Sequence, residues 1–94
     1  MLRKEAIQSH QEKNYLIMKI RLECLRMNEL KHHLIKDDQA KEVIQDKLNW
    51  MHHQIRFYQN ESDVLPLINH FNWLVFQFNQ HLDDDSSKIS SINT

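Results

Sequence analysis

The chain has 94 residues, no glycine, a single proline and a formal net charge of −1. This length supports one domain with a modest core. Glycine supplies tight turns, β-hairpins and phosphate-binding loops, so its absence excludes most β architectures and nucleotide-binding folds. Most of the abundant residue types favour helix, so the composition predicts an all-α protein.

Cys24 is the only cysteine. The chain therefore has no intrachain disulfide and no CxxC metal pair, and we expect a reducing, cytoplasmic location. No apolar run approaches the length of about 18 residues that a membrane span needs. The first ten residues also lack the apolar core of a signal peptide.

Charge is unevenly distributed along the chain. Residues 1–36 carry eight Lys/Arg and four Asp/Glu (+4), whereas residues 37–94 carry four and nine (−5). The two halves can neutralise each other across a helical hairpin or an antiparallel dimer. The alternative is nucleic-acid binding through the basic residues of the first half, although these do not form a dense stripe. They are Arg21, Arg26, Lys31 and Lys36.

A first helix is expected over about residues 3–36. Apolar and charged residues alternate in MKIRLEC, which is typical of a strand, but no second strand or turn signal exists to pair with it. Read as a helix, the segment has two apolar faces. One consists of Leu16, Ile17, Ile20, Cys24 and Met27. The other consists of Met18, Leu22 and Leu25.

A second helix is expected over about 38–59, with Asp37 and Asp38 capping its positive end. A heptad register also runs across this point, so one long coiled-coil helix is the alternative. The polar residues Asp37 and Lys41 in that register favour a break. The core stripe comprises Ile44, Leu48, Met51, Ile55 and Tyr58. Val43, Trp50 and Phe57 form a neighbouring stripe, and Asn60 is the expected left-handed terminator.

A third helix is expected over about 63–82, capped by Ser62 or Asp63, with Pro66 in its first turn. Its broad core face comprises Val64, Leu67, Ile68, Phe71, Leu74, Val75, Phe78 and Leu82. Leu65, Trp73 and Phe76 lie on the opposite side. Residues 83–94, acidic and serine-rich, are expected to form a flexible tail after a single domain spanning residues 1–82.

Each helix therefore carries more apolar surface than a three-helix monomer can bury. Four aromatic residues on the second faces could hide on the order of 600–1000 Å², about one partner's share of a standard interface. We predict an antiparallel helical hairpin plus a third helix, a three-helix bundle unit that assembles into a dimeric helical bundle. The predicted interface residues are Met18, Leu22, Leu25, Val43, Trp50, Phe57, Leu65, Trp73 and Phe76.

The chain has seven histidines, which suggests a metal site, but their spacing does not support one. Adjacent helical residues point about 100° apart, so neither His-His pair can chelate one ion. Glu29 and His32 have the spacing used in di-iron bundles, but one chain lacks the second such motif, which only a dimer could supply. A pH response of histidines near an interface is a further hypothesis. We expect no metal, no cofactor and no catalytic residues.

These patterns predict a small non-enzymatic α-helical protein that self-associates and binds or regulates another protein, as an adaptor or inhibitor does. The first alternative is a nucleic-acid-binding regulator that uses the basic first helix. The second is a metal-binding helical bundle.

Overall fold

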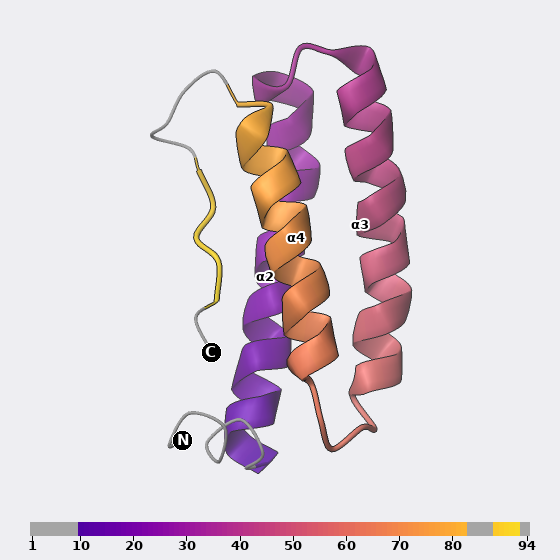
Figure 1. Cartoon of the computed structure of the whole chain (residues 1–94), viewed down its shortest axis with the longest axis vertical. Coiled ribbons are helices and arrows are strands. Elements are labelled where there is room, and N and C mark those ends of the chain that lie inside the picture. Colours follow the sequence, from indigo (N-terminus) through magenta and orange to yellow (C-terminus); the bar gives the residue numbers. More distant parts are fainter. Residues whose placement is uncertain (1–9, 83–87, 93–94) are drawn as a thin grey trace.

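The computed structural model describes residues 10–82 and 88–92. Its three helices are α2 (His10–Leu34), α3 (Asp38–Tyr58) and α4 (Leu65–Gln80), which run up, down and up (Figure 1). Residues 88–92, which we call segment 88–92, run back alongside α4 without regular secondary structure. The predicted all-α three-helix arrangement is confirmed, whereas its assembly into a dimer stays a prediction. Residues 3–9 of the expected first helix lie outside the described residues.

The core is formed by one apolar face of each helix. The face of α2 that contains Ile20, Cys24 and Met27 is fully buried, as is the Ile44–Ile55 stripe of α3. All eight residues predicted for the core face of the third helix are buried too. Tyr58, predicted as the last core residue of α3, is only partly buried and packs against the core. None of the helices in the described part of the chain is long and apolar enough to cross a membrane.

A sharp turn separates α2 from α3. The Asp37 carboxylate accepts a hydrogen bond from the Gln39 backbone N–H at 3.0 Å, which caps the N-terminus of α3. Ile35 in the turn is almost completely buried, so it holds the connection against the core. The two segments are therefore separate helices, and the continuous coiled-coil helix that the heptad register allowed is not formed.

The end of α3 differs from the expectation of a left-handed residue at Asn60. No described residue has a positive φ. Instead, the chain leaves α3 through short-range turns, in which the N–H groups of Asn60 and Glu61 donate to the carbonyls of Phe57 and Tyr58. A long-range contact assists this exit, because the Lys13 ammonium of α2 donates to the carbonyl of Glu61 at 2.7 Å and to that of Gln59 at 3.0 Å. A cation at a helix C-terminus satisfies free carbonyls and opposes the negative end of the macrodipole.

The start of α4 is set by Asp63 and Pro66. The Asp63 carboxylate accepts from the Leu65 N–H at 3.0 Å, and Pro66 occupies the first turn, where its missing N–H costs no helical bond. Val64, rather than Ser62 or Asp63, is the N-cap residue, and its side chain makes no capping hydrogen bond. The aspartate therefore acts one residue earlier than a standard cap.

Candidate interaction surfaces

The exposed side of α4 is neutral and aromatic. The helix contains no Asp, Glu, Lys or Arg in its sixteen residues. Its exposed positions follow one another at +4, +3 and +4, which places them in one stripe. They are Asn69, Trp73, Phe76 and Gln80. A solvent-facing helix side without a single formal charge is unusual, because charged residues normally cover such surfaces.

The second stripe of α3 adjoins this side of α4. The rings of Trp50 and His70 meet edge to face, with centroids 4.6 Å apart and an interplanar angle of 87°. The Lys47 ammonium lies 4.5 Å from the centroid of the Trp50 ring and 4.7 Å from that of Trp73. One cation thus contacts a tryptophan from each helix. Trp50 is half-buried as a result and packs against the core.

Val43 and Phe57 lie seven residues to either side of Trp50, so they share its stripe. Both are exposed, with 57% of the accessible surface of each open to solvent. On α4, Trp73 is 46% and Phe76 is 56% exposed. We call the surface formed by Val43, Trp50, Phe57, Trp73 and Phe76 the aromatic face.

A second apolar surface runs along α2. Four large residues at spacings of +3, +4 and +3 are each between 47% and 57% exposed. They are Tyr15, Met18, Leu22 and Leu25, and we call them the α2 stripe. At 100° per residue they lie opposite the buried face of the same helix, so the α2 stripe faces away from the core that α2 forms with α3 and α4. The sequence pattern had indicated three of these residues and missed Tyr15, which the same spacing points to.

Eight of the nine residues predicted as an interface therefore fall on two surfaces rather than one. Seven of the nine are exposed, while Trp50 and Leu65 are partly buried and pack against the core. Leu65 belongs to neither surface as defined above. Whether any of the nine contacts another molecule stays a prediction.

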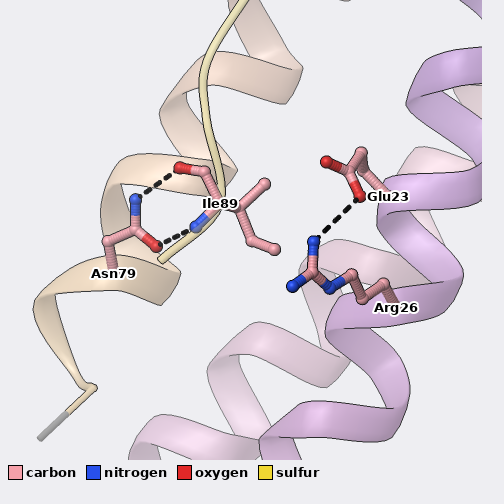
Figure 2. A network of polar contacts seen from close by, with 4 residues as sticks. All are labelled: Glu23, Arg26, Asn79 and Ile89. Carbon is pink, nitrogen blue, oxygen red and sulfur yellow. Dashed lines mark hydrogen bonds and ion pairs between the residues drawn. The ribbon is translucent and has the colours of Figure 1, made fainter. Parts of the chain in front are cut away.

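Segment 88–92 was expected to be part of a flexible tail, but it is attached to α4 by two asparagines. The Asn79 amide donates to the Ile89 carbonyl and accepts from the Ile89 N–H, both at 2.9 Å (Figure 2). Asn72 makes the same pair of bonds with Ile92, both at 2.8 Å. The side chains of Ile89 and Ile92 are 3% and 8% exposed. Residues 83–87 of the expected tail lie outside the described residues.

Segment 88–92 lies alongside α4. In Figure 2 the Ile89 side chain points from the segment toward α2, the helix on which Arg26 pairs with Glu23 at 3.8 Å. A pocket of about 280 Å³ lies between the segment and α4, lined by Asn72, Val75, Phe76, Asn79, Gln80, Lys88 and Ser91. The two asparagines were not predicted, although the sequence shows their spacing of seven and the IxxI pattern of the tail.

The basic residues proposed for nucleic-acid binding are not equally accessible. Lys31 is only 2% exposed, and its ammonium donates to the carbonyl and side-chain oxygens of Asn28, both at 3.0 Å. Burial, assisted by the nearby positive charge of Lys41, lowers the pKa of Lys31. Lys31 therefore does not present its charge to a phosphate backbone, and Arg26 pairs with Glu23.

Cys24 is a buried thiol. Burial raises the pKa of Cys24 to about 12, with the Glu23 carboxylate as a smaller cause. The neutral thiol is therefore the stable form, and it is neither nucleophilic nor a good metal ligand. Among the described residues, no three His, Cys, Asp or Glu side chains are grouped so that they could hold a metal ion. Glu29 and His32 are both exposed.

Comparisons with protein-family models, with curated proteins and with solved structures find no match for this chain. The aromatic face, the α2 stripe and the contacts of segment 88–92 are therefore the features that indicate a function.

Proposed function

We propose that this protein is a small, non-enzymatic helical interaction protein that forms a homodimer through its aromatic face. The observation that carries the proposal is the charge-free α4, whose exposed stripe includes Trp73 and Phe76. Depletion of charged residues together with aromatic enrichment is the compositional signal of an interface core, and tryptophan is the residue most enriched among energetic hot spots.

A second copy of the chain is the occupant that this surface fits. A two-fold interface brings the same surface together with itself, so any net charge on it would be repelled by its own copy. The exposed stripe of α4 is neutral, and Lys47 beside it is held by the two tryptophan rings. The α2 stripe lacks this property, because Lys19 and Arg21 flank it.

The exposed area is of the right size for the centre of a dimer interface. A whole aromatic side chain has roughly 150–250 Å², so the half-exposed Val43, Phe57, Trp73 and Phe76 together leave roughly 250–450 Å² open. One partner in a standard interface contributes about 800 Å². The neutral Asn69 and Gln80 lie at the two ends of the α4 stripe and extend it as a polar rim.

The oligomeric state tests this proposal. Light scattering or sedimentation should give the wild-type chain twice its monomer mass of 11.5 kDa. Trp73→Ala combined with Phe76→Ala should return it to a monomer. Leu22→Ala with Leu25→Ala is the matched control, since it removes two similarly exposed apolar side chains from α2 and should leave the dimer intact. A wild-type monomer at high micromolar concentration would refute the proposal, as would a double variant on α4 that stays dimeric.

The α2 stripe is the surface through which the dimer binds another protein. Its +3, +4, +3 spacing suits an amphipathic helix, and the flanking Lys19 and Arg21 favour one with acidic flanks. A designed leucine-stripe peptide with Glu flanks should bind the wild type, and the same peptide with Lys flanks should not. Leu22→Ala with Leu25→Ala should abolish binding. Equal binding of both peptides would contradict this assignment.

A cytoplasmic location is part of the proposal and depends only on the lone, reduced Cys24.

A further inference from the structure

Asn72 and Asn79 recognise the backbone of segment 88–92, not its side chains. Each amide makes both of its bonds to a single isoleucine, one with the N–H and one with the C=O. Every residue except proline offers these two groups. The two hydrogen-bonded pairs would therefore form with any extended segment that reached the same place, as backbone bonds do when a peptide is added to a sheet edge.

The spacing of the two asparagines matches an extended chain. Asn72 and Asn79 are seven residues apart, a rise of about 10.5 Å along an α-helix. Ile89 and Ile92 are three residues apart, or about 10 Å in an extended chain. The segment runs antiparallel to α4, because the earlier isoleucine meets the later asparagine. Helix and extended chain therefore stay in register over both contacts.

Selectivity comes from the two buried side chains. Ile89 and Ile92 are buried, whereas Lys88, Ser90 and Ser91 between and beside them are exposed. The site therefore selects peptides with apolar residues at two positions, three residues apart, and tolerates polar residues at the other positions. In Figure 2 the Ile89 side chain points toward α2.

We infer that the strip of α4 between Asn72 and Asn79 on which segment 88–92 lies, which we call the groove, is a binding site for extended peptides with two apolar residues three positions apart. Segment 88–92 is its intramolecular ligand. A peptide from another molecule binds there by displacing the segment. Neither asparagine that binds the segment belongs to the aromatic face, although Phe76 of that face lines the pocket beside the segment.

Binding of a free peptide to the full-length chain tests the inference. The probe is a fluorescein-labelled synthetic peptide, SSKISSINT, which copies residues 86–94. Ile89→Ser with Ile92→Ser in the full-length chain should vacate the groove, and this variant should bind the probe saturably. The wild type should bind the probe at least about tenfold more weakly, because the tethered segment competes at an effective concentration in the millimolar range.

Two controls identify the groove as the site of binding. A probe in which both isoleucines are replaced by serine should not bind. Asn72→Ala and Asn79→Ala, added to the vacated variant, should abolish binding of the original probe, whereas Asn69→Ala should not. Asn69 is the matched control, as an exposed asparagine on another side of the same helix. A folded, vacated variant that fails to bind the probe, or that binds both probes equally, would overturn the inference.

A second measurement needs no substitution. In the ¹⁵N-labelled wild-type chain, the amide protons of Ile89 and Ile92 are hydrogen-bonded and should exchange slowly. Several millimolar unlabelled SSKISSINT should displace the segment, which would move both amide resonances and speed their exchange. Resonances of Ile89 and Ile92 that stay unchanged at that concentration would count against the site even if the vacated variant did not fold.

Discussion

The ammonium of Lys13 donates a 2.7 Å hydrogen bond to the backbone carbonyl of Glu61, 48 residues later in the sequence. This contact joins the beginning of α2 to the turn that ends α3, where a chain without glycine has no left-handed residue to close the helix. Hydrogen bonds with a charged donor contribute about 1.5–3 kcal/mol when they are well formed. The Lys13 hydrogen bonds are exposed to solvent, so their contribution falls below that range, at about 1 kcal/mol.

Lys13→Met should therefore lower the free energy of unfolding by about 1 kcal/mol, since the apolar stem is kept and only the charged donor is lost. Urea denaturation followed by circular dichroism measures this. Lys19→Met removes a charge from the same helix at a position without this contact and should change stability by less than about 0.5 kcal/mol. Equal effects of the two substitutions would mean that Lys13 acts only through general charge.

The contact between Trp50 and His70 gives a second prediction. Edge-to-face ring pairs contribute about 0.5–1.5 kcal/mol beyond the area that they bury. His70→Ala should destabilise the fold by about that amount, and it should shift the Trp50 fluorescence toward the red as solvent reaches the ring. His53→Ala is the control, because His53 is exposed. An unchanged emission spectrum in His70→Ala would show that the imidazole does not shield the indole.

Burial of Cys24 predicts a loss of stability in alkali. Its pKa is about 12 in the folded chain, against an ordinary value of 9.0. Because the folded pKa is raised, the stability that the neutral Cys24 thiol contributes is complete below about pH 9. Above that pH it decreases by about 1.4 kcal/mol per pH unit, until the pH reaches the folded pKa of about 12. Between pH 9 and 10.5, wild-type protein should lose about 2 kcal/mol more than Cys24→Ala does. Equal losses in the two proteins would contradict the raised pKa.

The same burial predicts that the thiol is inert. Native protein at pH 7.5 should react with a maleimide only as fast as it unfolds, because the thiolate is the reactive species. Reaction should become rapid in denaturing urea. Rapid labelling of native protein would show that the α2 core face opens locally.

Segment 88–92 should contribute to stability as part of the core. Ile89→Ala removes buried methyl groups and should lower the free energy of unfolding by about 2 kcal/mol or more. The neighbouring Ser90→Ala, at an exposed position, should be within about 0.5 kcal/mol of wild type. If both substitutions are neutral in denaturant titrations, the segment is not held on α4 in solution.

The core was predictable because helical periodicity is a local property. The eight apolar residues of the third helix recur on one arc, and each of them is buried. The cap at Asp37 was predictable for the same reason, since its hydrogen bond spans two residues. The different exposure of Trp50 and Trp73 was not predictable in this way. Both lie on second stripes, yet the packing of α3 on α4 partly buries Trp50 and leaves Trp73 exposed.

By itself, the sequence determined the helical class, the three core faces and the excess of apolar surface beyond them, because each depends on residues within a few turns of one another. Only the tertiary structure decided that Lys13 closes the end of α3, that Lys31 is buried, and that Asn72 and Asn79 bind segment 88–92. A polar side chain can donate or accept anywhere within reach, so its partner follows from how the helices pack and not from any repeat in the sequence.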